Sequence, residues 1–96
     1  MASREEYIDK LENQLREWNE QIDKLQKRAE DESREIKTKL DKRIDELRVK
    51  RAELKVKLER IKDTGEEAFE KISKDAEKLW DDIKEGISEV RSTLKK

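Results

Sequence analysis

Histidine, cysteine and proline are all missing from this chain of 96 residues. Without cysteine, the chain offers no disulfide, no thiolate nucleophile and no thiol metal site. Cysteine usage therefore does not indicate whether the protein resides in an oxidising or a reducing compartment. Without histidine, it lacks the Glu-x-x-His motif of a di-iron bundle and the usual base that activates a serine nucleophile. We therefore expect no metal site, no cofactor and no enzymatic activity.

Long apolar runs are missing as well. No window approaches the roughly 20 apolar residues that a membrane-spanning helix needs. The opening "MASREEYIDK" also lacks the basic start and the apolar segment of a secretory signal. These two features lead us to expect a cytoplasmic protein.

The composition favours thin helices over a compact globule. Charged residues make up 53% of the chain and hydrophobic ones only 31%. A wide core could not be filled from so few apolar residues, whereas a helix needs only one buried stripe. Periodic apolar residues along nearly the whole chain argue against disorder. We expect a single elongated, all-α coiled-coil domain over residues 1–96.

The apolar residues recur three or four positions apart, as the seam of a coiled coil requires. The first helix is expected to begin at a capping box formed by Ser3 and Glu6. Ile36 is in phase with Ile8, and only Glu32 interrupts the seam between them, so this helix is expected to continue to about residue 62. The residues expected to form packing and self-association contacts are Ile8, Leu11, Leu15, Trp18, Ile22, Leu25, Ile36, Leu40, Ile44, Leu47, Leu54, Leu58, Phe69, Ile72, Leu79, Trp80, Ile83 and Ile87.

A turn is expected at 62–66, in the stretch "DTGEE". Asp63 is a good capping residue, Thr64 and Glu67 have capping-box spacing, and Gly65 can adopt a positive φ. A second helix should then cover about 65–94. A straight helix through Gly65 stays open as an alternative, because a glycine inside a helix costs only about 1 kcal/mol.

Charge supports folding back at this turn. Residues 1–36 carry 7 basic and 11 acidic side chains, residues 37–62 carry 11 and 5, and residues 63–96 carry 7 and 10. An antiparallel hairpin would lay the acidic last third along the basic middle. Facing core residues would then have residue numbers that sum to 127, as Ile44 and Ile83 do.

In such a hairpin the helix over about 3–62 is twice as long as the helix over about 65–94. The first half of the longer helix therefore has no helix packed against its apolar stripe. The stripe from Ile8 to Leu25 would need a second copy of the chain, so a homo-oligomer, most simply a dimer, is expected. The alternative is a second break near "EDES", which gives a monomeric three-helix bundle with the same contacts inside one chain.

Other binding functions have weaker support in the sequence. The basic middle segment 37–62 could contact phosphates, but interleaved acids such as Asp45 and Glu53 divide it and it contains no aromatic residue. The amphipathic last third could lie on a lipid surface, although its acidic polar face disfavours anionic membranes. Nucleic acid and membrane therefore remain alternatives to a protein partner.

Two segments, "YIDKLENQLREWNEQIDKL" and "GEEAFEKISKDAEKLWDDIKEGI", resemble the small bacterial coiled-coil proteins of a stress-response family with cyanobacterial members. The resemblance covers nearly the full length, although Phe69 stands where that family is expected to have tryptophan. It implies a cytoplasmic, stress-associated protein and no catalytic or binding residue. Our hypothesis is a non-enzymatic structural or interaction protein that self-associates and shields partner proteins.

Overall fold

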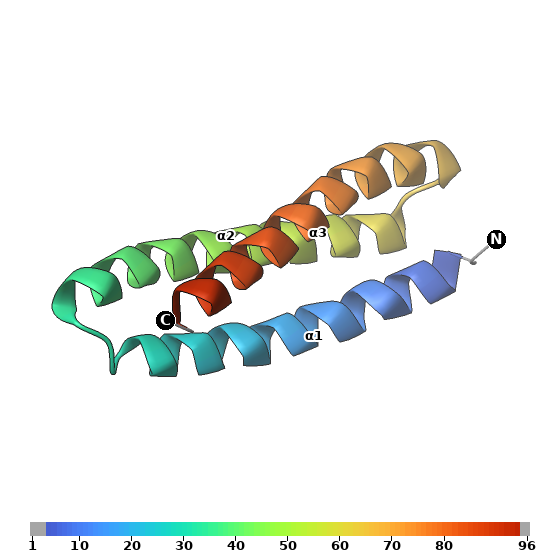
Figure 1. The fold of residues 1–96 in the computed structure, drawn as a ribbon. Helices are drawn as coiled ribbons and strands as arrows, with labels where there is room; N and C mark the ends of the chain where they lie inside the picture. Colours follow the sequence, from blue (N-terminus) through green and yellow to red (C-terminus); the bar gives the residue numbers. More distant parts are fainter. Residues whose placement is uncertain (1–3, 95–96) are drawn as a thin grey trace.

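The protein is an all-helical bundle in the computed structural model, which describes residues 4–94. Helix α1 spans Arg4–Ala29, α2 spans Arg34–Asp63 and α3 spans Glu66–Leu94, and no strand occurs within this described range. Helices α1 and α3 run in the same direction and α2 runs in the opposite one (Figure 1). The bundle measures 49 × 17 × 17 Å.

The expected single helix over about 3–62 is wrong, because α1 ends at Ala29 and α2 begins only at Arg34. The amide groups of Asp31 and Glu32 donate to the carbonyl oxygens three residues earlier, at 3.2 and 3.1 Å, which tightens the last turn. Ser33 is extended, and its carbonyl accepts from the Lys37 amide at 2.8 Å, so a new helix starts there. The three-helix alternative therefore describes the chain better than the two-helix hairpin.

The second turn consists of Thr64 and Gly65, since α2 ends at Asp63 and α3 begins at Glu66. Neither glycine has a positive φ, so the turn does not use the left-handed conformation that we expected of Gly65. The Thr64 hydroxyl is buried without a hydrogen-bond partner, so the expected capping bond from its side chain does not form. The other expected capping box, at Ser3, lies outside the described residues.

The core is one continuous apolar cluster shared by the three helices. Of the residues expected to pack, Ile8, Ile36, Phe69, Leu79 and Trp80 are half-buried against this cluster and the others are buried. Further buried residues of the core that were not among those expected are Ala29, Ile61, Ala76, Gly86, Val90 and Leu94. The stripe of α1 is thus covered by α2 and α3 of the same chain, which removes the reason to expect a second copy.

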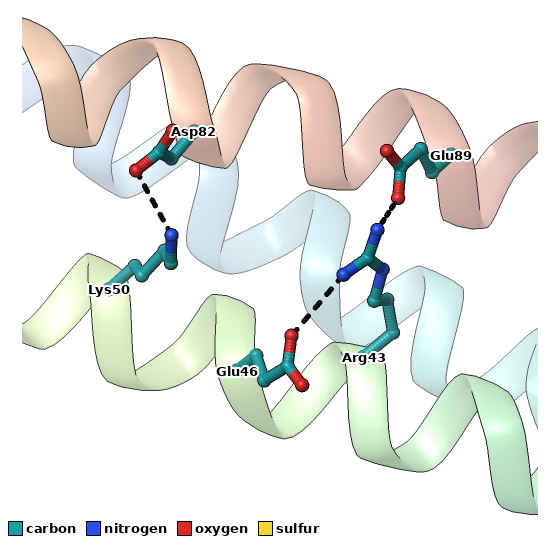
Figure 2. Close-up of polar contacts among 5 residues, drawn as sticks. All are labelled: Arg43, Glu46, Lys50, Asp82 and Glu89. Atoms are coloured by element: carbon teal, nitrogen blue, oxygen red, sulfur yellow. Dashed lines mark hydrogen bonds and ion pairs between the residues drawn. The ribbon is translucent and has the colours of Figure 1, made fainter.

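A ladder of three ion pairs joins α2 to α3. Arg43 pairs with Glu89, Lys50 with Asp82 at 3.0 Å, and Lys57 with Asp75 at 3.7 Å. The basic members are seven residues apart, and so are the acidic ones, so each pair lies two helical turns from the next. Figure 2 shows the first two pairs bridging the neighbouring helices, with Glu46 also bound to Arg43.

The ladder fixes the antiparallel register of α2 and α3. The residue numbers in each pair sum to 132, and the Leu47 side chain lies against Gly86, for a sum of 133. The expected sum of 127 is therefore wrong. Apolar residues spaced by three and four can be matched at more than one offset, so the stripe alone does not define the register.

The other side of α2 is paired with α1. Lys62 binds Glu12 at 2.8 Å, and Arg48 binds Asp23 at 2.8 Å. The pair with Lys62 lowers the pKa of Glu12, chiefly through the side-chain hydrogen bond and then through its charge. The basic helix thus lies between two more acidic ones, as the alternation of charge along the chain indicated.

Arg4 ties the start of α1 to the turn between α2 and α3. Its guanidinium donates to the carbonyl oxygens of Ile61 and Thr64 and lies 5.3 Å from the centre of the Phe69 ring. Carbonyl groups in the last turn of a helix have no partner within the helix, and a cation there also interacts favourably with the helix dipole. One side chain therefore connects all three helices at this end of the bundle.

The two glycines predict opposite responses to a larger side chain. A Cβ atom at Gly86 would overlap Cδ2 of Leu47, whereas one at Gly65 would meet nothing within 4 Å. We expect Gly86→Val to lower the free energy of unfolding by about 1–3 kcal/mol through overpacking. Gly65→Ala should raise it by about 0.4–1 kcal/mol, because alanine restricts the unfolded chain. Urea unfolding measures both, and a destabilising Gly65→Ala would contradict the described turn.

The ion-pair ladder predicts that a reversed charge can be rescued from the facing helix. Lys50 and Asp82 are 40% and 49% exposed, so solvent screens their attraction. We expect Lys50→Glu to lower the free energy of unfolding by about 0.5–1 kcal/mol, and Asp82→Lys in the same chain to recover most of this loss. A double-mutant cycle at low and high salt gives the coupling energy; additive effects of the two changes would mean that the helices are not paired in this register.

Candidate aromatic groove between α1 and α3

All four aromatic residues of the chain lie where α1 meets α3. The rings of Tyr7 and Phe69 have centres 5.8 Å apart and meet edge to face. Trp18 and Trp80 do the same, with ring centres 4.9 Å apart. Such pairs contribute about 0.5–1.5 kcal/mol beyond the apolar area they bury. Contact between α1 and α3 is otherwise the least extensive of the three helix interfaces, so aromatic pairing is the main link between these helices.

The spacing of the aromatic residues explains this arrangement. Tyr7 and Trp18 are 11 residues apart on α1, and Phe69 and Trp80 are 11 apart on α3. Eleven residues make almost three whole helical turns, so each helix presents its two rings on one face. Since α1 and α3 are parallel, equal spacings bring both pairs into contact with the same offset of 62 residues.

A surface groove of about 230 Å³ opens beside these rings. It is lined by Tyr7, Lys10 and Leu11 of α1 and by Glu77, Trp80 and Asp81 of α3, and we call this set the aromatic groove. The ammonium group of Lys10 lies 5.6 Å from the centre of the Trp80 ring. Trp80 is only partly covered by Trp18, so one side of its ring remains available to the groove.

The groove attracts positive charge for two reasons. The face of an indole ring carries negative electrostatic potential, which favours an ammonium or guanidinium group above it. Glu77 and Asp81 lie four residues apart on α3 and add two carboxylates to the same lining. The position of Lys10 over Trp80 shows the attraction within the chain itself.

The hydroxyl group of Tyr7 reports on the same environment. It lies 3.5 Å from the carbonyl oxygen of Ser73, a long contact that makes at most a weak hydrogen bond. Burial raises the pKa of Tyr7, and the nearby carboxylate of Glu77 raises it further. Both effects disfavour a negative charge at this position, in keeping with a groove suited to cations.

The residues expected to mediate self-association are therefore divided between two roles. Trp18 is buried in the bundle, whereas Trp80 packs on it and also lines the groove. Sequence reasoning missed Lys10, Glu77 and Asp81 as groove residues. The equal 11-residue spacing of the aromatic pairs was the available signal, but it has meaning only once α1 and α3 are known to be separate, parallel helices.

Much of the basic middle segment is engaged in ion pairs. Arg43, Lys50 and Lys57 are bound by carboxylates of α3, and Arg48 and Lys62 by carboxylates of α1. A phosphate backbone would have to compete with these carboxylates for the same cations. This arrangement weakens the case for nucleic-acid binding through residues 37–62.

Two features are absent from residues 4–94. This part of the chain holds no group of three or more acidic side chains arranged to bind a metal ion. Among its three helices, none has an apolar stretch of the length and hydropathy needed to cross a bilayer.

No protein-family model, curated protein or solved structure matches this chain. The resemblance to stress-response coiled-coil proteins therefore stays a prediction. The class that the structure defines is an all-α protein of three packed helices.

The environment of Tyr7 predicts a high pH midpoint for ionisation of its phenol. The folded state holds this proton more tightly than the unfolded chain does. Tyr7 therefore stabilises the fold below the unfolded pKa of about 10, and this contribution is lost as pH rises through the higher folded pKa. Tyr7 is the only tyrosine, so phenolate absorbance reports it alone. We expect a higher midpoint in the folded protein than in denaturant, and a partial return in Glu77→Gln. Equal midpoints would mean that the hydroxyl is fully solvated.

Proposed function

We propose that the protein is a non-enzymatic interaction protein whose aromatic groove binds a segment of another polypeptide that is rich in basic and apolar side chains. The observation that carries this proposal is the ammonium group of Lys10 over Trp80, in a groove that also contains two carboxylates. A lysine or arginine of a partner would use the same ring face and the same negative charges.

The groove supplies contacts of two kinds. Tyr7 and Trp80, both half-buried, offer apolar surface that would cover the methylene groups of a long basic side chain. Glu77 and Asp81 would hold its charged end. Aromatic residues dominate the strongly contributing positions of protein interfaces, because they bury a large area with few rotatable bonds. Lys10 can rotate away into water, since it is exposed and forms no ion pair within the described chain.

Shielding of partner proteins under stress would be one use of such a groove. Segments that combine basic and apolar residues become exposed when other proteins unfold, and a rigid groove that covers them would limit their association. The resemblance noted in the sequence favours this use. The expected self-association loses its basis, because the core stripe that called for a second copy is already buried within the chain. We therefore propose that a single chain carries the groove.

The alternative of lipid binding has a structural obstacle. The apolar face of α3, with Ile72, Ile83 and Ile87 as members, is buried against the other helices. The bundle would have to open before that face could reach a lipid surface. The groove requires no such change.

The proposal can be tested with two designed amphipathic peptides of equal length, one of leucine and lysine and the other of leucine and glutamate. We expect the lysine peptide alone to change the tryptophan fluorescence of the protein. Glu77→Gln and Asp81→Asn should each weaken its binding about threefold, which corresponds to roughly 0.6 kcal/mol.

Glu20→Gln serves as the matched control, because Glu20 is exposed on α1 and does not line the aromatic groove. It makes the same change of charge and should leave the affinity as it is. The proposal fails if both peptides bind equally well, or if all three substitutions have the same effect.

A further inference from the structure

A second pocket lies between α1 and α2, on a different side of the bundle from the aromatic groove. It is an open surface pocket of about 280 Å³, slightly below the range for small-ligand sites, which begins at about 300 Å³. Its charged and polar lining comprises Glu12, Arg16, Asn19, Arg51, Lys55, Glu59 and Lys62. Four basic and two acidic side chains leave the pocket with a net charge of +2.

Arg51 is a charged residue at a position where the apolar stripe of α2 would otherwise have a hydrophobic residue. It lies between Leu47 and Leu54 in the buried stripe of α2, three or four residues from each, where an apolar residue would continue the core. A charged side chain there contributes less to stability than a leucine or methionine of similar size. Breaks of the local pattern are expected at functional or strained sites.

The orientation of Arg51 leaves most of its hydrogen-bonding capacity unused. Its Nε–H donates to the carbonyl oxygen of Leu15 on α1 at 3.1 Å, which fixes the guanidinium at the pocket. A guanidinium has five N–H donors, so four remain on the two terminal nitrogens. No carboxylate pairs with them within residues 4–94.

Two further cations of the pocket make no ion pair within residues 4–94, although the charge of Arg16 adds to the effect of Lys62 in lowering the pKa of Glu12. Arg16 on α1 and Lys55 on α2 form no ion pair within the described chain. Lys62 differs from them, because it is bound to Glu12 at 2.8 Å and to Glu59 at 3.7 Å.

Other basic residues, such as Lys39 and Lys42 of α2, also form no ion pair in the described chain. What distinguishes Arg16, Arg51 and Lys55 is that they line one pocket, with Arg51 in the apolar stripe of α2.

We infer that this pocket is an anion-binding site for a phosphate group, either free or carried by a small organic phosphate ester. Arg51 would hold two phosphate oxygens with its terminal nitrogens, and Arg16 and Lys55 would contact the remaining ones from either side. Arginine matches phosphate geometry through its planar fork, and hydrogen bonds between charged groups are roughly twice as strong as neutral ones. The +2 charge of the pocket would balance a phosphate dianion.

The inference is tested by thermal unfolding in inorganic phosphate, in glycerol phosphate and in sodium chloride at equal pH and ionic strength. A ligand that binds only the folded state raises the melting temperature as its concentration increases. We expect phosphate to raise it above the chloride value. Arg51→Met should raise the dissociation constant by at least about tenfold, and Lys55→Gln by about threefold.

The stability of the Arg51→Met protein in chloride separates binding from a structural role. If Arg51 is present for phosphate, methionine should keep or raise the melting temperature in chloride, since it restores the apolar stripe. A purely structural arginine would give a less stable protein with an unchanged response to phosphate. Should Arg51→Met fail to fold, the exposed positions Arg16→Gln and Lys55→Gln still report binding.

Lys24→Gln is the matched control, because Lys24 is an exposed lysine of α1 outside the pocket. It should respond to phosphate as the unaltered protein does. A larger response to glycerol phosphate than to inorganic phosphate would support an ester as the ligand, and a response to inorganic phosphate alone would support the free ion. The inference is overturned if phosphate and chloride act alike on the unaltered protein, or if Lys24→Gln weakens the response as much as Lys55→Gln.

Discussion

Burial of three narrow apolar stripes against one another is the constraint on which the rest of the structure depends. Each helix has only about one large apolar residue per turn, so no two of them could enclose a core of useful size. Burying one large aliphatic side chain contributes about 1.5–3 kcal/mol, whereas an exposed ion pair contributes about 0–1 kcal/mol. Burial of the stripes therefore favours a chain with two turns and three packed helices. The ion pairs then favour one register between neighbouring helices.

Charge has its effect through register and pairing. The alternation of acidic and basic segments places the basic helix α2 between α1 and α3, where carboxylates on both sides can reach it. The ladder of Arg43, Lys50 and Lys57 with α3 repeats with the same period as the core, so one shift of register would break every pair together. Aromatic pairs have the corresponding role between α1 and α3, which have no such ladder. Each interface is thus defined by a different kind of contact.

The sequence was sufficient for the helical class, for the position of the second turn and for nearly all of the core residues. It was misleading at the first turn, because "EDES" contains neither glycine nor proline and Ile36 stays in phase with Ile8 across it. Glu32, at a seam position, was the one local sign of a break, and three acidic residues together add to it. Burying the α1 stripe against α2 and α3 stabilises the fold more than the loss of a few helical hydrogen bonds at the turn destabilises it. The local sequence does not show this, because it depends on tertiary contacts.

The two candidate surfaces were beyond sequence reasoning for a related reason. The aromatic groove needs α1 and α3 to be parallel neighbours, and the α1–α2 pocket needs Arg16 and Lys55 to face each other across a turn that was not expected. Arg51 could have been noticed as a charged residue in the apolar stripe of α2. Its lack of a carboxylate partner becomes visible only in three dimensions.

Small-angle X-ray scattering with an absolute mass is the measurement that tests the three-helix fold most directly. The account predicts the 11.6 kDa mass of one chain, a radius of gyration close to the 15.2 Å of its Cα atoms, and a longest dimension near 49 Å before hydration. A continuous helix over residues 3–62 would instead be about 90 Å long at 1.5 Å per residue. A particle of two chains with that length would contradict the turn at residues 30–33, and with it the two surfaces that depend on it.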